Sequence, residues 1–297
     1  MSESVPFEKF DGAGNDFVVV DAESPVADRA AFARAHCDRE TGVADEAVAR
    51  HGADGVLFLA LEAGSEPATV TMTLVQPDGS IAEMCGNGAR CVAAWAAERS
   101  ETTTFDIETP AGTRRAVVEG EEVAVEMGAS RFDADAVPLA GDEPLVDTAL
   151  PELEGTPAEG LRVTAVNTGV PHAVVFVDDV ADVAIDAVAP PIRHAEVFPE
   201  GANVTFASSD GDGFRQRTYE RGVEGETQAC GTGAVAVAAA AKRLERLDLG
   251  TEDEWVRVSP PGGDLAVSVP DDGPARLRGP AVKQFEGELP ASPEVAE

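Results

Sequence analysis

The chain has 297 residues, and its 43% hydrophobic content is enough to bury two ordinary cores. Asp and Glu number 55 against 22 Lys and Arg, giving a net charge of −33, which argues against nucleic acid as a partner because phosphate binding needs a basic footprint. The acids are spread along the chain, which favours adaptation to a salt-rich (halophilic) cytosol, where screening reduces self-repulsion.

Nothing in the sequence is typical of a membrane-spanning or secretory segment. The first 21 residues lack a basic region followed by an apolar one, and no run approaches the roughly 18 apolar residues of a spanning helix. Four cysteines (Cys37, Cys85, Cys91 and Cys230) are too few for a disulfide scaffold, so we expect reduced thiols. The sequence therefore predicts a cytoplasmic protein with no membrane partner.

Alternating strand and helix signals run along the first part of the chain. Apolar strands are predicted at 17–20, 56–61 and 69–75, with a helical stretch from 27 to about 51. A second helix follows from 85 to about 99, then a strand at 105–108 and a hairpin of 114–119 with 123–127. These elements define a predicted first domain of residues 1–129.

A second predicted domain covers residues 130–275. It begins with a proline-rich connection at 134–160 and continues with strand signals at 161–177, 204–206 and 214–220. A helix is predicted at 234–247, followed by strands at 255–258 and 265–269. Residues 276–288 should form a last strand that returns to one sheet, and 289–297 should be a flexible acidic tail.

A repeated phrase links the two domains. Cys-Gly-Asn-Gly-Ala at 85–89 and Cys-Gly-Thr-Gly-Ala at 230–234 stand 145 positions apart, each at the head of an alanine-rich helical run. Gly-led loops entering apolar strands at 14–21 and 169–178, and strand-to-turn segments at 107–112 and 256–262, repeat in the same order. The period is too long for a solenoid and indicates an internal duplication with one thiol in each half. We therefore expect the active site to lie between the halves.

Each repeated cysteine stands at the start of a helix. Unpaired N–H groups and the helix macrodipole at that position lower the pKa of a thiol and bind anions. Two such termini could hold one carboxylate between Cys85 and Cys230, and a thiolate and a thiol on opposite sides could invert a carbon centre by two-base proton transfer. Cys37 and Cys91 have no matched context, so we predict that they are structural.

Several segments together resemble the diaminopimelate epimerase family over nearly the whole chain. They are Lys-Phe-Asp-Gly-Ala-Gly-Asn-Asp-Phe at 9–17, Asp-Gly-Ser at 78–80, Met-Cys-Gly-Asn-Gly-Ala-Arg-Cys at 84–91, Pro-His at 171–172, Gly-Ala-Asn-Val at 201–204, Tyr-Glu-Arg-Gly at 219–222 and Glu-Thr-Gln-Ala-Cys-Gly-Thr-Gly at 226–233. The resemblance implies an α/β (α+β) fold of two pseudo-symmetric halves, each a curved, mostly antiparallel sheet wrapped around a central helix.

The resemblance also implies an activity. Family members are pyridoxal-phosphate-independent isomerases that interconvert LL-2,6-diaminopimelate and meso-diaminopimelate in lysine biosynthesis, with no cofactor and no metal. No phosphate loop or metal cluster stands out in the sequence, and the three lysines (Lys9, Lys242 and Lys283) are not beside the repeated motif. A homodimer and a small-molecule substrate, diaminopimelate, are implied as well.

Matching positions to the family motifs implies roles for individual residues. Cys85 and Cys230 are the acid/base pair, and His172 and Glu220 resemble the polar, catalytic pair near the thiols. The implied substrate-binding residues are Asn15, Gln76, Gly86, Asn87, Asn203, Glu220, Arg221, Gly231 and Thr232. Arg221 has a physical rationale, because a guanidinium can bind the distal carboxylate of the substrate with two hydrogen bonds.

The chain departs from the family pattern at three positions, and other functions compete. Many members carry Asn where this chain has Gln76 and Val170, and Glu224 adds one residue to the loop after Arg221. A proline or hydroxyproline racemase-type epimerase is the nearest alternative, but such enzymes typically have His where this chain has Asn87. A noncatalytic amino-acid-binding protein, with thiols that only line a pocket, is the second alternative.

Overall fold

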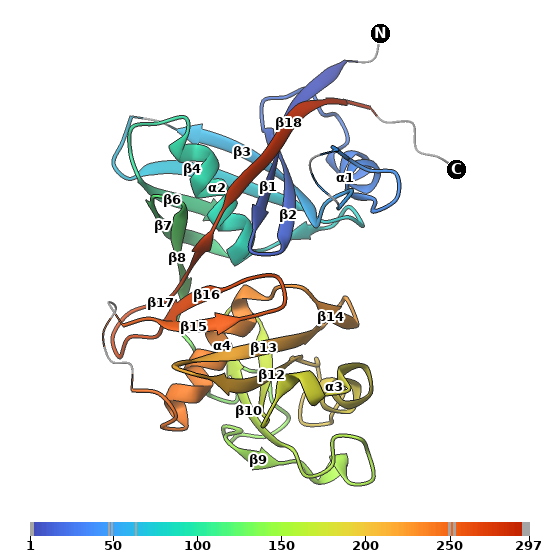
Figure 1. Cartoon of the computed structure of the whole chain (residues 1–297), viewed down its shortest axis with the longest axis vertical. Coiled ribbons are helices and arrows are strands. Elements are labelled where there is room, and N and C mark those ends of the chain that lie inside the picture. The colour runs from blue at the N-terminus through green and yellow to red at the C-terminus, as the bar shows by residue number, and fades with distance from the viewer. Residues whose placement is uncertain are drawn as a thin grey trace. The chain divides into compact units, whose positions relative to one another are not determined.

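The computed structural model describes residues 3–46, 48, 50–62, 64–248, 251 and 254–292 (Figure 1). The chain divides into two compact units, one of residues 1–125 with 279–297 and the other of residues 126–278. We predicted a boundary near 129 and a returning segment from 276. The observed divisions fall inside strand β8 (Glu122–Gly128) and strand β17 (Ala275–Pro280).

The first unit is built from the first part of the chain and from one strand near its C-terminus. Its elements are β1 (Ser4–Gly12), β2 (Asn15–Asp21), α1 (Arg29–Cys37), β3 (Gly55–Glu62), β4 (Ala68–Val75), β5 (Ile81–Ala82), α2 (Gly86–Ala97), β6 (Thr104–Thr109), β7 (Gly112–Glu119), the start of β8 and, near the C-terminus, β18 (Val282–Pro290).

The second unit repeats this order. Its elements are the end of β8, β9 (Thr148–Ala149), the short helix η1 (Pro151–Leu153), β10 (Arg162–Asn167), β11 (Pro171–Phe176), η2 (Val180–Asp182), α3 (Ile185–Arg193), β12 (Asn203–Asp210), β13 (Gly213–Glu220), β14 (Gly225–Thr227), α4 (Gly231–Arg243), β15 (Val256–Ser259), β16 (Leu265–Ser268) and β17.

The strand pairings confirm that the two halves have the same topology. In the first unit, β1 to β8 pair along the chain with β2–β3 and β4–β6 parallel and the other pairs antiparallel. In the second unit, β10 to β17 pair in the same way, with β11–β12 and β13–β15 parallel. The same mixture of parallel and antiparallel pairs in one order is the structural counterpart of the sequence repeat.

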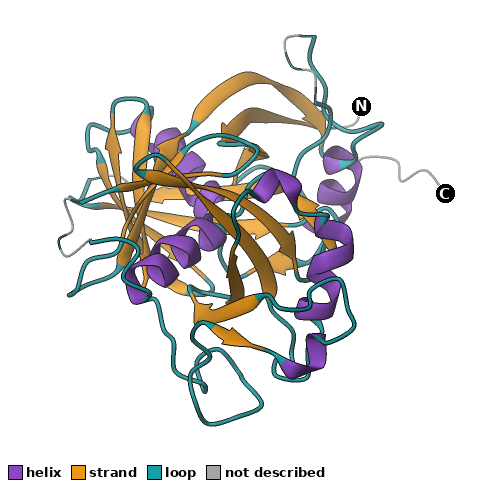
Figure 2. Ribbon diagram, turned by 60° about the horizontal axis from the view of Figure 1, so that its bottom comes forward, coloured by secondary structure: helices purple, strands orange, loops and turns teal. Residues whose placement is uncertain are grey.

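Each sheet wraps around one alanine-rich helix. Helix α2 contacts β1, β2, β3, β4, β6 and β7, and helix α4 contacts β10, β11, β12, β13, β15 and β16. Ala234 through Ala241 of α4 are all buried, and a helix that is apolar on every side belongs in the centre of a core. Small side chains let the surrounding strands approach closely. Strands outnumber helices in both units (Figure 2).

A strand from the end of the chain completes the first unit. β18 pairs antiparallel with β1 from Ser4 with Pro290 to Asp11 with Val282. The short strand β9 pairs antiparallel with β10 in the second unit. The prediction of a loose tail from 289 is wrong at its start, because Leu289 and Pro290 belong to β18 and the N–H of Ala291 donates to the carbonyl of Glu3. Residues 293–297 of that predicted tail lie outside the described residues.

The predicted helix over 27–51 is too long. Helix α1 starts after the N-cap Asp28, whose side chain accepts the Ala31 N–H, and ends at Cys37. The Oδ1 atom of Asp38 accepts the N–H groups of Glu40 and Thr41 at 2.9 and 2.7 Å. An aspartate that bonds to the backbone of the following residues replaces the helical hydrogen bonds and ends the helix.

Two other predicted strands are each divided into two. The stretch 161–177 is two strands, β10 and β11, joined by a turn at Gly169, where φ is +108°. The single strand predicted over 276–288 is likewise two strands, the end of β17 and most of β18.

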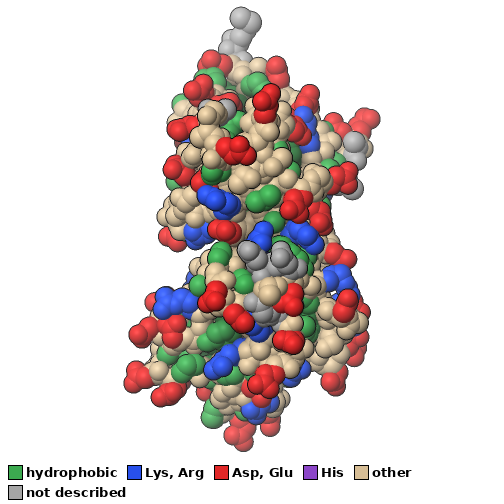
Figure 3. All heavy atoms as spheres, turned by 90° about the vertical axis from the view of Figure 1, so that its left-hand side faces the viewer, with side chains coloured by type: hydrophobic (Ala, Val, Ile, Leu, Met, Phe, Trp, Pro, Cys, Tyr) green, Lys and Arg blue, Asp and Glu red, His purple; other side chains and the backbone are tan. Residues whose placement is uncertain are grey.

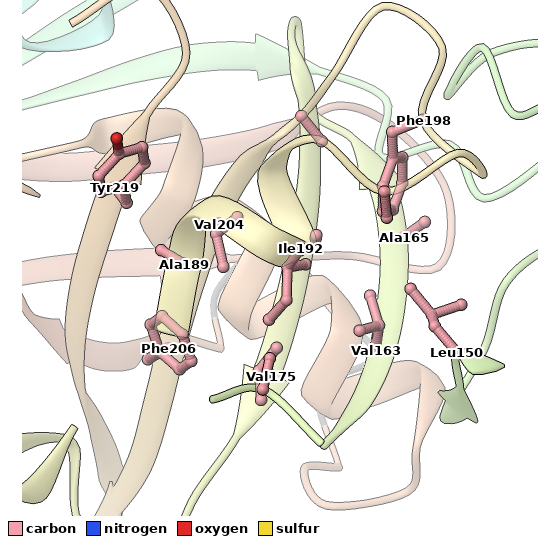
Figure 4. Close-up of a cluster of buried hydrophobic side chains, with 14 of the residues drawn as sticks. Leu150, Val163, Ala165, Val175, Ala189, Ile192, Phe198, Val204, Phe206 and Tyr219 are labelled. Atoms are coloured by element: carbon pink, nitrogen blue, oxygen red, sulfur yellow. The ribbon is translucent and has the colours of Figure 1, made fainter. Parts of the chain in front are cut away.

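Helix α3 was not predicted, because Pro190 and Pro191 lie inside it and proline removes helical N–H donors. Ile185, Ala189 and Ile192 of this helix nevertheless pack into the core of the unit, together with side chains of β10, β11 and β12 (Figure 4).

Acidic side chains are scattered over the face drawn in Figure 3 and do not form one block. Among the described residues, no helix is both long and apolar enough to cross a membrane.

Candidate active site

The first half-site is built at the start of α2. Cys85 is the N-cap residue, with extended backbone angles of φ −144° and ψ 115°, and its Sγ accepts the N–H of Gly88 at 3.4 Å. Gly86 is the first residue of the helix. The first N–H groups of a helix have no partner within it, so this terminus offers donors to an anion beside the thiol.

Asn15 and Asn87 lie against each other in this unit. The Asn87 Nδ2 donates to Asn15 Oδ1 at 2.6 Å, and the Asn15 Nδ2 donates to Asp54 Oδ2 at 3.1 Å. These bonds fix the orientation of both side-chain amides, because an ionised Asp54 can only accept a hydrogen bond and the Asn15 nitrogen must therefore face it. The Oδ1 atom of Asn87 is buried and has no hydrogen-bond partner in the described part of the chain.

Asp54 is itself held in place by charges. Arg39 Nη2 and Arg50 Nη2 both bind Asp54 Oδ1, the latter at 3.2 Å, and the N–H of Asp16 donates to Asp54 Oδ2 at 3.0 Å. The orientation of Asn15 therefore depends on an ion-pair network. Sequence reasoning missed Asp54; the only signal was an acid just before a buried strand.

The second half-site is built at the start of α4. Cys230 is the N-cap residue, with φ −133° and ψ 99°, and only 6% of it is exposed. Gly231 begins the helix, and Thr232 Oγ1 lies 3.4 Å from Cys230 Sγ. Burial and the charge of Glu220 raise the pKa of Cys230 well above its ordinary value. The expectation that the helix terminus leaves this thiol with a lowered pKa is therefore wrong, because desolvation outweighs the terminus.

The hydroxyl group of Thr232 lies between His172 and Cys230. Its Nε2 lies 3.0 Å from Thr232 Oγ1 and its Nδ1 lies 3.0 Å from Thr205 Oγ1. The ring is fully buried, and burial, together with the nearby Arg221 charge, lowers the pKa of His172 to about 3. The imidazole is therefore neutral near pH 7 and acts as a hydrogen-bonding group there.

The remaining predicted residues of the second half gather around this histidine. Asn203 Oδ1 accepts the backbone N–H of Arg221 at 2.7 Å, and Asn203 Nδ2 lies 3.5 Å from His172 Nε2. The Arg221 Nη1 donates to the carbonyl oxygens of Glu200 and Gly201, each at 3.3 Å. Glu220 accepts the hydroxyl of Thr227. The structure thus brings Cys230, Thr232, His172, Asn203, Glu220 and Arg221 together.

The three departures from the family pattern lie outside these contacts. The exposed Gln76 donates from Nε2 to Ser80 Oγ at 2.8 Å within its own turn. The carbonyl of Val170 accepts the N–H of Thr168 at 3.2 Å. Glu224 has a positive φ of 55° and pairs with Arg193 at 2.9 Å, which ties the loop after Arg221 to the end of α3.

Three buried polar residues behind His172 were also missed from the sequence. Thr205 in β12 and Gln216 and Thr218 in β13 are buried; β12 is buried on both faces over most of its length, whereas β13 alternates between buried and partly exposed residues from Phe214 to Thr218. For Thr205 the signal was a polar residue between the apolar Val204 and Phe206, whereas β13 is polar along most of its length and offered no such signal. In the described part of the chain, no group of three or more His, Cys, Asp or Glu is arranged to hold a metal ion.

Comparison with solved structures defines the class of fold. A PhzF-family phenazine biosynthesis protein of Bacillus anthracis superposes with a TM-score of 0.70 at 18% identity, covering 97% of this chain and 99% of that one. A hydroxyproline epimerase of Agrobacterium vitis, with bound trans-4-hydroxy-L-proline, superposes with a TM-score of 0.61 at 16% identity, covering 96% and 91%. At such identities the comparison shows a shared fold.

Comparison of sequences defines the family. The family model described as diaminopimelate epimerase matches residues 7–132 and 164–284. A diaminopimelate epimerase of Methanocella arvoryzae is 43% identical to this chain, with 96% of each protein covered. One of Methanothrix thermoacetophila is 42% identical, covering 95% of this chain and 94% of its own length. The chain belongs to the diaminopimelate epimerase family, and an epimerase is an isomerase.

Proposed function

We propose that the protein interconverts LL-2,6-diaminopimelate and meso-diaminopimelate by cofactor-independent, two-base proton transfer at the α-carbon, as a step of lysine biosynthesis. The observation that carries this proposal is the duplicated half-site, a cysteine at the N-terminus of the central helix in each unit. Membership of the family supports the choice of substrate.

The reaction needs one thiolate and one thiol. In the proposed mechanism, the sulfur of either Cys85 or Cys230 takes the α-proton while the other cysteine gives its S–H proton to the opposite face of the carbon. The charge that develops passes into the α-carboxylate, and the N–H groups at Gly86, Asn87, Gly231 and Thr232 are the donors that we assign to it. No net proton is consumed, because one thiol is lost as the other forms.

The remaining residues hold the two ends of the substrate. We assign Asn15 and the unpaired Oδ1 of Asn87 to ammonium recognition, and Asn203 with Arg221 to the distal end, where the guanidinium can bind a carboxylate. Glu220 lies near Cys230 and favours its protonated thiol, which suits a proton donor. Gln76 is assigned to substrate binding from its motif position alone.

Stereoinversion with isotope exchange tests the proposal. Reduced protein in deuterated water and molar KCl should convert LL-diaminopimelate to the meso form with deuterium at the inverted carbon, and should leave L-proline unchanged. Inversion of L-proline in place of diaminopimelate would favour the racemase-type alternative. Binding of diaminopimelate without exchange would show an amino-acid-binding protein and overturn the proposal.

Location and assembly belong to the same proposal. We infer a homodimer in a reducing, salt-rich cytoplasm, supported by the family resemblance and by the net charge of −33. Sedimentation at high salt tests the dimer, since a monomer at working concentrations would contradict it.

A further inference from the structure

The two cysteines have unlike surroundings although their units share one topology. A continuous chain of hydrogen bonds leads from the interior of the second unit to Cys230. It consists of Gln216 Nε2 to Thr218 Oγ1 at 3.0 Å, Thr218 to Thr205 Oγ1 at 3.2 Å, Thr205 to His172 Nδ1 at 3.0 Å, His172 Nε2 to Thr232 Oγ1 at 3.0 Å and Thr232 to Cys230 Sγ at 3.4 Å.

The donor at the inner end of this chain of hydrogen bonds is defined. Gln216 Nε2 also lies 3.1 Å from the carbonyl oxygen of Cys230, which can only accept. The amide nitrogen must therefore face both the carbonyl and Thr218 Oγ1, and it donates to both. Since Thr218 Oγ1 receives a hydrogen bond from Gln216, its own proton is available for Thr205.

The same logic continues to the sulfur. In this order, Thr205 Oγ1 accepts a hydrogen bond from the Thr218 hydroxyl and donates its own to His172 Nδ1, an arrangement that has the ring proton on Nε2. With that tautomer, Nε2–H donates a hydrogen bond to Thr232 Oγ1, which leaves the Thr232 hydroxyl to donate to Cys230 Sγ. Asn203 Nδ2 is a competing donor toward Nε2, but at 3.5 Å it is at the limit of a hydrogen bond, and the 3.0 Å contact with Thr232 is the stronger one.

The first unit has apolar residues at the equivalent positions. His172 pairs with Asn203 across β11 and β12 as Phe17 pairs with Gly55 across β2 and β3. Counting along the paired strands, the equivalents of Thr205, Thr218 and Gln216 are Leu57, Leu74 and Met72.

Contacts beneath the helices support this register. A β-carbon added to Gly233 of α4 would lie 2.8 Å from Gln216 Nε2, and one added to Gly88 of α2 would lie 3.4 Å from Met72 Cε. All four apolar residues, Phe17, Leu57, Leu74 and Met72, are buried. Apolar packing therefore suffices for the fold at these positions, so the polar set in the second unit calls for another explanation.

We propose that Gln216, Thr218 and Thr205 are positioning residues for Cys230, which set the tautomer of His172 and so direct a donated hydrogen bond through Thr232 into the Cys230 sulfur, favouring its thiolate. This inference rests on the proposed function, in which Cys230 gives up and takes back a proton. This chain of hydrogen bonds opposes the effects of burial and of the Glu220 charge, both of which favour the thiol form of Cys230. The equivalent residues of the first unit are apolar, so the two half-sites differ in the side chains behind them.

Replacing Gln216 by its first-unit equivalent tests the direction of the chain. Gln216→Met and Thr205→Val should each raise the titration midpoint of Cys230. The titration is monitored by the ultraviolet absorbance of the thiolate, from which the absorbance of a Cys230→Ser variant is subtracted. A shift of about one pH unit corresponds to a tenfold smaller thiolate fraction at neutral pH. Thr205→Ser keeps the hydroxyl and should restore the midpoint.

Two controls separate this role from a structural one. Ser208 is a buried hydroxyl on the same strand that accepts the Val180 N–H at 3.2 Å, so Ser208→Ala should leave the midpoint unchanged. Nitrogen-15 NMR of His172 should report the Nε2–H tautomer in the parent protein and a mixture in Gln216→Met. An unchanged Cys230 midpoint in Gln216→Met, or an Nδ1–H tautomer in the parent, would overturn the proposal. Neither measurement needs substrate, so failure of the proposed epimerase activity is seen separately.

Discussion

The buried pair of Lys9 and Asp16 should be essential to the first unit. Lys9 Nζ lies 2.7 Å from Asp16 Oδ2, and the two side chains are 1% and 4% exposed. Asp16→Asn leaves the Lys9 ammonium buried with only the carbonyl of Gly52 and a weaker amide acceptor. Breaking a buried ion pair from one side costs about 3–5 kcal/mol, so we expect the free energy of unfolding to fall by about that amount. Arg39 is 35% exposed and keeps Asp54, so its lost contact should add little.

Urea unfolding followed by tryptophan fluorescence measures this loss. Trp95 lies in the first unit and Trp255 in the second, so a Trp255→Phe background reports on the first unit alone. The double variant Lys9→Met with Asp16→Asn should recover most of the stability, since it removes the unpaired charge. A loss below about 1 kcal/mol in Asp16→Asn would refute the reasoning, because the lysine would then not depend on its partner.

The pH dependence of the same variant gives a second check. Burial raises the pKa of Asp16, but hydrogen bonds from Arg39 and the charge of Lys9 outweigh it and hold the pKa below its ordinary value. A carboxyl group with a lowered folded-state pKa stabilises the fold above its unfolded pKa of about 3.9, and this stabilisation is lost as the pH falls through the folded value. The stability curves of parent and Asp16→Asn should therefore converge below about pH 4.

Four further predictions concern the site and the charge. Cys85→Ala and Cys230→Ala should each reduce epimerisation by about 10²–10⁴, whereas Cys91→Ala should reduce it little; near-normal turnover of either of the first two would exclude a two-base mechanism. Arg221→Lys should weaken diaminopimelate binding by about 1.5–3 kcal/mol, and calorimetry showing an equal loss for a ligand without the distal carboxylate would show that Arg221 does not read that end. Burial lowers the pKa of His172 to about 3, so as the pH falls below about 6.5 the ring takes up a proton in the unfolded state but not in the folded one. The free energy of unfolding should therefore fall with pH more steeply in the parent than in His172→Gln. Parallel curves would count against a buried neutral ring. The melting temperature should rise from low salt to molar KCl as the charge of −33 is screened, and a flat or falling series would contradict salt adaptation.

Most strands and both central helices were predictable from the sequence, because alternating and alanine-rich patterns are local. The helix predicted over 27–51 failed where Asp38 captures the backbone after Cys37. Helix α3 was missed because its two prolines argue against a helix in the sequence, whereas its apolar side chains pack into the core of the second unit and stabilise it there. Family motifs named Asn15, Asn87, His172 and other site residues, but not the partners that orient them.

The sequence by itself determined the duplication and the paired thiols, since both follow from residue spacing and from the chemistry of a cysteine ahead of a helix. Tertiary structure decided that β18 closes the sheet beside β1, at the other end of the chain. It also decided that Thr205 of β12 lies 3.0 Å from the His172 ring on β11, and that Gln216 of β13 reaches Thr205 through Thr218. The register between strands sets which side chains meet, and that register arises from long-range pairing that no local pattern encodes.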